Sequence, residues 1–238
     1  MKRLVVLFIL FISGSFAVSA QPKIDSLRVN LEQIKVQNGE KSNEYLSAID
    51  QTIQAIAGYD GAPLEHLHIA ADYRKQHLNI VAKMKGEYSV EYAEDLFRLG
   101  NTYRRLGNTD NALSLFQKSC AIFEQNQCWG SEFFELTTYM ASLILRQQQQ
   151  YEKAIEFQEK CVKCTNCRYG VKDMRHIETC DLLLRLAGET KRWDIIKQYS
   201  RQVLDNIDTL TKENFQYYSY ATLGEHIWLW VEKRYNEA

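Results

Sequence analysis

The sequence predicts an all-α fold, a solenoid of antiparallel helix pairs, and two observations support this prediction. Small or apolar residues in similar surroundings recur every 42 positions, at Ala70, Ala112, Ala154, Ile196 and Ala238. A fixed period of about 20 to 50 residues is typical of stacked repeats, each of which buries its apolar face against its neighbours. In addition, no proline follows Pro63, which favours long helices because proline breaks them.

Apolar periodicity and turn residues place the helices in order along the chain. They are expected at residues 42–57, 64–85, 92–106, 109–125, 132–149, 151–164, 173–187, 192–209 and 212–233, after a weaker helix over 25–36. The sequence Gly-Tyr-Asp-Gly at 58–61 interrupts the first pair, because such residues favour a turn. We therefore expect a degenerate first repeat in this region.

Residues 96–116, LFRLGNTYRRLGNTDNALSLF, carry two glycines within an otherwise helical pattern. A glycine inside a helix costs about 1 kcal/mol relative to alanine. We expect Gly100 to allow a close approach of the next helix, which offsets this cost. Gly107 is expected to end its helix in a left-handed conformation, where glycine is favoured.

The same stretch resembles the tetratricopeptide repeat. The matching positions are Leu96-x2-Leu99-Gly100-x2-Tyr103 and Ala112-x3-Phe116. The family pattern is Trp-x2-Leu-Gly-x2-Tyr, then Ala-x3-Phe and Pro, so a leucine replaces the tryptophan here and the final proline is missing. The period, longer than the usual length of about 34 residues, is similar to that of the longer repeats of the kinesin light chain type.

This resemblance implies a right-handed superhelix and a definite domain organisation. A degenerate N-terminal segment over 21–62 is expected to precede a repeat array over 63–238. Within the array, units are expected at about 93–126, 135–168 and 177–210, with a partial unit from 219.

The N-terminal segment over 1–20 has the features of a secretory signal peptide. A basic start at residues 2–3 precedes an apolar run over 4–12 and a small-residue end, Val-Ser-Ala, at 18–20. The mature chain is therefore expected to be exported, periplasmic or secreted. Stable membrane insertion is not expected after cleavage. A membrane-spanning helix needs about 20 consecutive apolar residues, and no later segment approaches this length.

Charge and motifs exclude several function classes. The formal net charge is −1 and no basic block occurs, so the electrostatic footprint of nucleic-acid binding is absent. The sequence contains no nucleophile elbow, zinc-protease pattern, phosphate loop or dinucleotide fingerprint. We therefore expect a protein that is not an enzyme and needs no cofactor.

Six cysteines allow three interpretations. They can be buried as small apolar side chains. They can also form disulfides in an oxidising compartment, with Cys164 or Cys167 joined to Cys180, or Cys128 joined to Cys167. The third interpretation is a metal or redox module, because thiolates and an imidazole are zinc ligands. Its candidate residues are Cys164, Cys167, His176 and Cys180.

The family resemblance implies a non-enzymatic protein–protein interaction scaffold. Its partner, a peptide or protein, would bind in a concave groove lined by the first helix of each pair. The residues expected to face this groove are Asn101, Arg104, Arg105, Tyr139 and Arg146.

Two alternatives stay open. The chain stops at Ala238, where a further helix is expected, so it can be the sensory or regulatory arm of a longer signalling or peptidase protein. Alternatively, the cysteines can make it a metal or redox module.

Overall fold

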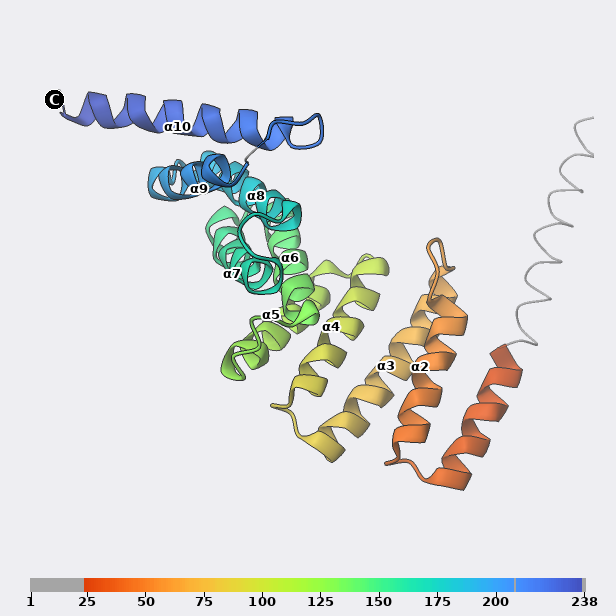
Figure 1. Cartoon of the computed structure of the whole chain (residues 1–238). Coiled ribbons are helices and arrows are strands. Elements are labelled where there is room, and N and C mark those ends of the chain that lie inside the picture. The colour runs from red at the N-terminus through yellow and green to blue at the C-terminus, as the bar shows by residue number, and fades with distance from the viewer. Residues whose placement is uncertain (1–23, 208, 237–238) are drawn as a thin grey trace, which may run out of the picture. The chain divides into compact units, whose positions relative to one another are not determined.

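The computed structural model describes residues 24–207 and 209–236, with side chains as far as residue 233. The expected signal peptide over 1–20 and the terminal Ala238 lie outside these residues. All regular structure within the described ranges is helical, so the all-α prediction is confirmed (Figure 1). No helix in this part of the chain is long and apolar enough to cross a membrane.

The helices follow one another with short connections. A helix over 24–38 precedes α2 (Asn43–Ala57), α3 (Leu64–Lys85), α4 (Val90–Arg105), α5 (Thr109–Gln125), α6 (Glu132–Gln147), α7 (Tyr151–Tyr169), α8 (Met174–Thr190), α9 (Trp193–Asn206) and α10 (Phe215–Asn236). They form two compact units. The N-terminal unit contains residues 24–87 and 102–107, and the C-terminal unit contains residues 88–101 and the described residues from 108 onward.

In the N-terminal unit, α2 and α3 pack around a shared apolar core. Tyr45 and Ile49 of α2 are fully buried and belong to one cluster with Leu67 of α3. Ser42 is the N-cap of α2. Its hydroxyl accepts the Tyr45 N–H at 3.1 Å and so satisfies a donor that has no partner within the helix. The expected boundary after residue 62 lies between two helices that the structure packs together in one unit.

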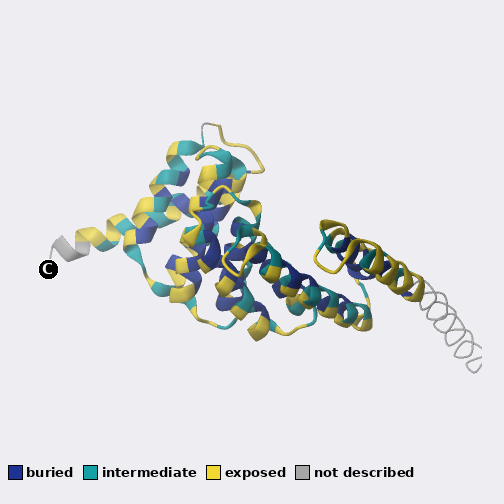
Figure 2. Cartoon of the chain, turned by 90° about the horizontal axis from the view of Figure 1, so that it is seen from below, coloured by how far each residue is buried: buried dark blue, intermediate teal, exposed yellow. Residues whose placement is uncertain are grey.

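The C-terminal unit consists of helix pairs that start at a constant interval. The first helices α4, α6 and α8 begin at 90, 132 and 174, and the second helices α5, α7 and α9 begin at 109, 151 and 193. Both series keep the period found in the sequence. Ala112, Ala154 and Ile196 each occupy the fourth position of a second helix and are at most 5% exposed. Buried residues lie on the facing sides of these helices (Figure 2), so the period reports one repeated buried position.

Both glycines of the first pair have the roles expected of them. A Cβ placed on Gly100 would lie 2.7 Å from Cε1 of Phe116 and 3.3 Å from the Ala112 carbonyl oxygen. The close approach of α4 and α5 at this glycine is therefore confirmed. Gly107 has φ +77°, in the left-handed region that favours glycine, and follows the end of α4 as predicted.

The end of α7 differs from the prediction. The helix continues to Tyr169 instead of stopping at residue 164. Gly170, with φ +84°, follows it and donates its N–H to the Asn166 carbonyl at 2.9 Å. The helix therefore runs on to the glycine that can adopt the left-handed stop conformation.

The loop between α9 and α10 is also longer than expected. The helices were predicted over 192–209 and 212–233, but α9 ends at Asn206 and α10 begins at Phe215. Asn214 holds this loop in a turn. Its Nδ2 donates to the Thr209 carbonyl at 2.8 Å, and its Oδ1 accepts the Thr211 N–H at 2.8 Å. The side chain of Asn214 thus delays the start of α10 to Phe215.

Candidate functional site

A cleft of about 500 Å³ opens in the C-terminal unit, between side chains of α6, α7, α8 and the start of α10. Helices α6 and α8 are the first helices of their pairs, the class of helix expected to line a groove. The lining residues are Glu135, Leu136 and Tyr139 of α6, Cys161 and Thr165 of α7, Arg175, Glu178, Thr179, Asp181 and Leu182 of α8, and Tyr217 of α10.

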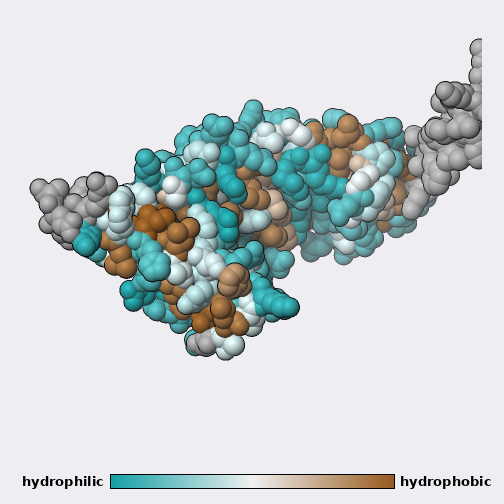
Figure 3. Space-filling view, turned by 90° about the horizontal axis from the view of Figure 1, so that it is seen from above, coloured by the Kyte–Doolittle hydropathy of each residue, from teal (hydrophilic) through white to brown (hydrophobic). Residues whose placement is uncertain are grey.

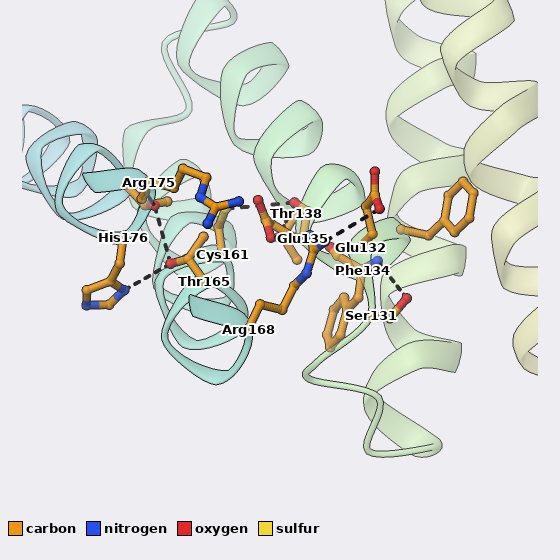
Figure 4. Close-up of polar contacts among 12 residues, drawn as sticks. Ser131, Glu132, Phe134, Glu135, Thr138, Cys161, Thr165, Arg168, Arg175 and His176 are labelled. Atoms are coloured by element: carbon orange, nitrogen blue, oxygen red, sulfur yellow. Dashed lines mark hydrogen bonds and ion pairs between the residues drawn. The ribbon is translucent and has the colours of Figure 1, made fainter. Parts of the chain in front are cut away.

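Glu135, on the α6 side of the cleft, is held in an ion pair. Its Oε2 accepts a hydrogen bond from Nη1 of Arg168 at 2.5 Å, and the same guanidinium lies 3.5 Å from a carboxylate oxygen of Glu132 (Figure 4). Arg168 comes from α7, so the pair ties α7 to α6 and neutralises the charge of Glu135.

Arg175 stands at the start of α8 and is also paired. Its Nε donates to Oδ1 of Asp173 at 2.9 Å, and its guanidinium carbon lies 3.5 Å from the centre of the Tyr169 ring. The same Oδ1 accepts the Arg175 backbone N–H at 2.9 Å, so Asp173 is the N-cap of α8. The hydrogen bonds from Arg175 hold the pKa of Asp173 at about 2.

Asp181 is a buried carboxylate with a partner one turn away. Only 6% of this residue is exposed, and its Oδ2 accepts a hydrogen bond from Nε of Arg185 at 2.7 Å. Burial raises the pKa of Asp181, and the hydrogen bond from Arg185 opposes that rise. The Arg185 guanidinium in turn lies 4.5 Å from the centre of the Tyr220 ring.

Glu178, the third carboxylate that lines the cleft, has different neighbours from Glu135 and Asp181. Its side chain is exposed, and its Oε1 accepts a hydrogen bond from the Tyr217 hydroxyl at 3.1 Å. Among the described residues, no lysine or arginine forms an ion pair with this carboxylate. Glu178 therefore presents an oriented negative charge that no described residue neutralises.

Buried hydrogen bonds join α7 to α8 (Figure 4), and a further contact joins α8 to α9. Oγ1 of Thr165 lies 3.0 Å from Nδ1 of His176 and 3.3 Å from the donating hydroxyl of Thr179. The other ring nitrogen of His176 lies 2.8 Å from Nε2 of Gln202. Burial lowers the pKa of His176, so a neutral imidazole with both nitrogens engaged fixes the floor of the cleft.

A second surface of the C-terminal unit is apolar. Hydrophobic side chains gather beside α10 (Figure 3), where Leu223, Leu229 and Trp230 are 54%, 46% and 60% exposed. A hollow of about 120 Å³ in this region is lined by apolar residues, glycines and Tyr220. The cleft of α6 and α8 differs from this hollow, because charged and hydroxyl-bearing side chains make up most of its lining.

The five residues expected to face one groove do not lie together in the structure. Tyr139 lines the cleft and is 36% exposed. Arg146 is exposed in the last turn of α6, outside the lining, and Asn101 is half-buried in α4. Arg104 and Arg105 belong to the N-terminal unit. Of the five, the structure places only Tyr139 in the cleft.

Arg105 makes structural contacts that the sequence did not reveal. Its Nη1 donates to the Ala57 carbonyl and its Nη2 to the Tyr59 carbonyl, both at 2.7 Å. Carbonyl groups at a helix C-terminus lack partners within the helix. The guanidinium of Arg105 therefore closes the end of α2, which corrects the expectation that it faces a groove.

The residues that sequence reasoning missed are Glu178, Asp181 and Tyr217. The repeat period could have found two of them. Glu178 follows Leu136 by one period, and Asp181 follows Tyr139 by one period. Because equivalent positions of successive first helices share a face, extending the period from Tyr139 would have led to the α8 side of the cleft.

The six cysteines are all free thiols in the structure. The pairings considered for Cys128, Cys164, Cys167 and Cys180 are not formed. Cys164 and Cys180 are buried inside the C-terminal unit, whereas Cys167 is exposed and Cys128 is half-buried. Burial raises the pKa of the Cys180 thiol to about 12, which fits the interpretation of a small apolar side chain.

The proposed metal ligands do not come together either. Cys180 Sγ lies 3.5 Å from Nε2 of His176, one helical turn away. Within the described ranges, no group of three or more histidine, cysteine, aspartate or glutamate side chains could hold a metal ion. The four candidates, Cys164, Cys167, His176 and Cys180, therefore form a pair and two separate thiols.

Comparison with known proteins agrees with this architecture. Residues 93–126 and 138–164 match the tetratricopeptide repeat. No curated protein sequence matches the chain. The structure of BtubC (BKLC) from P. vanneervenii is 14% identical, with a TM-score of 0.55, over 91% of this chain and 88% of that one. The kinesin-light-chain-like TPR repeats from Podosopora anserina are 12% identical, with a TM-score of 0.47, over 79% of this chain and 98% of that one.

The two sequence matches coincide with helix pairs of the structure. The first covers α5 and nearly all of α4, and the second covers most of α6 and α7. The helices follow one another as in the fold of BtubC. This chain therefore contains tetratricopeptide repeats, at residues 93–126 and 138–164.

Proposed function

We propose that the chain is a non-enzymatic scaffold that binds an extended segment of a partner protein in the cleft of α6, α8 and α10. Tetratricopeptide-repeat domains generally act in protein–protein interaction and are typically not catalytic. The observation that carries the proposal is the cleft itself, where Tyr139 and Tyr217 lie with carboxylates over a floor fixed by hydrogen bonds. Tyrosine is among the residues enriched at protein interfaces.

The dimensions of helix packing favour a peptide as the occupant. Helices in direct contact lie about 8–10 Å apart, and α8 contacts α10 directly, so a segment of about 20 Å is needed to reach from α10 across α8 to the α6 side of the cleft. An extended chain rises about 3.3 Å per residue, and about six residues would cross the three helices. A segment of this length can contact all the side chains that line the cleft.

The chemistry of the cleft also favours binding over catalysis. Cys161 is the thiol among its lining residues, and burial raises its pKa to about 12. A thiol with such a pKa is a poor nucleophile at neutral pH. His176 is buried with both ring nitrogens in contact with neighbouring side chains, so it is not positioned to activate a substrate.

Site-specific cross-linking tests this proposal. A photoreactive benzoylphenylalanine replaces Tyr139 in cells that produce the protein naturally, and a matched protein carries it at Glu152, exposed at the start of α7. We expect a protein adduct from position 139, its loss when Leu182→Asp is added, and none from position 152. Equal adducts from both positions, or none from 139, would contradict binding in the cleft.

We further propose that the protein acts after export, on the basis of the signal-peptide pattern over residues 1–20. Cell fractionation of the full chain and of a variant lacking residues 2–20 tests this. Export is supported if only the full chain leaves the cytoplasm and is shortened to begin near Gln21. Retention of the full chain in the cytoplasm would contradict it.

A further inference from the structure

We infer that the cleft recognises its partner through a lysine or arginine side chain that pairs with Glu178. The inference rests on the proposed function, because it names the chemistry of the segment that would occupy the same cleft. It predicts a basic partner segment, a property that no motif of the sequence indicates.

The first argument is the charge balance of the lining. Three carboxylates and one guanidinium line the cleft: Glu135, Glu178, Asp181 and Arg175. Arg168 neutralises Glu135, Arg185 neutralises Asp181, and Asp173 neutralises Arg175. Within the described part of the chain, Glu178 has no cation of its own. Among the charged groups that line the cleft, Glu178 is therefore the one without an oppositely charged partner in the described part of the chain.

The second argument is that Glu178 is oriented before any ligand binds. The Tyr217 hydroxyl donates to Oε1 at 3.1 Å, and Oε2 remains available to a second donor. Tyr217 comes from α10 and Glu178 from α8, so a contact between helices sets the position of the carboxylate. Such preorganisation reduces the ordering cost that a ligand must overcome.

The third argument is the aromatic surroundings. Tyr139 and Tyr217 line the same cleft as Glu178. Lysine and arginine combine an apolar stem with a cationic head, and both interact favourably with aromatic faces. The chain already uses this contact nearby, since Arg185 lies over Tyr220 and Arg175 over Tyr169. An acidic segment would instead place a second carboxylate beside Glu178, which is unfavourable.

Peptide selection on the whole chain tests the inference. A phage library of random decapeptides is selected on the unchanged protein, on Glu178→Gln and on Glu65→Gln. Glutamine keeps the size of Glu178 and its ability to accept from Tyr217, but removes the charge. Glu65 is exposed at the start of α3 in the N-terminal unit, so its substitution removes the same charge away from the cleft.

We expect lysine and arginine to be enriched in peptides selected on the unchanged protein and on Glu65→Gln, and not on Glu178→Gln. A recovered peptide, labelled with fluorescein, should then bind Glu178→Gln about threefold to fivefold more weakly by fluorescence polarisation, as for a partly exposed ion pair. Replacing its basic residue by norleucine should cause a similar loss, with little further loss when both changes are combined.

The outcomes separate the inference from the proposed function. Suppose that the selected peptides no longer bind the Leu182→Asp protein, but that they are not enriched in lysine or arginine, or are equally enriched when selected on Glu178→Gln. This result would overturn the inference and leave binding in the cleft standing. If no selected peptide depends on Leu182, binding in the cleft fails, and the inference fails with it. Circular dichroism of each variant checks that helicity is retained.

Discussion

Gly100 controls how closely α4 and α5 approach, through the side chain that it lacks. Phe116 faces it and is fully buried, so the ring would have to shift within the packed interior to make room for a methyl group. We expect Gly100→Ala to lower the free energy of unfolding by about 1–3 kcal/mol through overpacking, although alanine is the better helix former by about 1 kcal/mol. Urea unfolding followed by circular dichroism measures the change.

Gly130→Ala is the matched control for this substitution. No atom lies within 4 Å of a Cβ placed on Gly130, and surface changes of this kind usually shift stability by less than about 0.5 kcal/mol. If Gly100→Ala were as stable as Gly130→Ala, the close contact with Phe116 would not be a constraint on the pair.

Arg105 acts at the same scale in the N-terminal unit. We expect Arg105→Ala to lower the free energy of unfolding by about 1–2 kcal/mol, because two carbonyls near the end of α2 lose a charged donor. Thermal unfolding checks this, with Arg146→Ala, an exposed arginine of α6, as the control. Equal melting temperatures for the two variants would show that water replaces the guanidinium without cost.

Because Arg105 holds the end of α2, substitutions at this residue are unsuitable for testing partner binding. A protein with both Arg104 and Arg105 changed to glutamate would bring a carboxylate toward the carbonyls of Ala57 and Tyr59. Loss of binding in that variant would then reflect damage to α2. The cleft substitutions Glu178→Gln and Leu182→Asp, in the C-terminal unit, avoid this confusion.

At the scale of the element, the start of α8 depends on the charge of Asp173. Its pKa of about 2 in the folded state, against an ordinary 3.8, means that the folded protein favours the ionised form. This contribution to stability is complete above about pH 4 and is lost as the pH falls from 4 toward 2. An asparagine at this position still caps the helix but has no charge.

We therefore expect Asp173→Asn to be less stable than the unchanged protein at pH 6, with a difference that shrinks as the pH falls below 4. Urea midpoints measured for both proteins between pH 6 and pH 2.5 give this difference. A difference that stays constant over the whole range would show that the ion pair with Arg175 does not contribute.

At the scale of the whole molecule, the cysteines report the integrity of the core. Four thiols are buried in the folded chain, those of Cys120, Cys161, Cys164 and Cys180. Burial raises the pKa of the Cys120 thiol to about 12, which suppresses the reactive thiolate as well as access to it. The exposed Cys167 and the half-buried Cys128 are more accessible to a reagent than this buried set.

We expect Ellman's reagent to label Cys167 rapidly and Cys128 more slowly in the folded protein, and all six thiols after unfolding without reductant. Thiol counting together with mass spectrometry of the labelled peptides identifies the sites. An incomplete thiol count in the unfolded chain would establish a disulfide, and so contradict the arrangement of free thiols in the structure.

The helices show how far sequence reasoning reaches in this fold. The predicted spans 64–85 and 109–125 coincide with α3 and α5, because residues that favour turns or helix ends stand on both sides of each span. The end of α7 was missed, since no residue near Cys164 signals continuation and the stop depends on Gly170. Helix ends are decided by single residues, so they are less predictable than the helices themselves.

The sequence by itself determined the helix pairs and their period, because a buried position that recurs once in every repeat is written in residue types and spacing. Only the tertiary structure decided which polar and charged groups find partners far away in the sequence. The partners of Glu135, Arg105 and Glu178 come from other helices or distant positions: Arg168, the end of α2, and Tyr217. Such contacts depend on how helices pack, and local sequence does not encode them, so the contrast between Glu178 and the other carboxylates of the cleft became visible only in three dimensions.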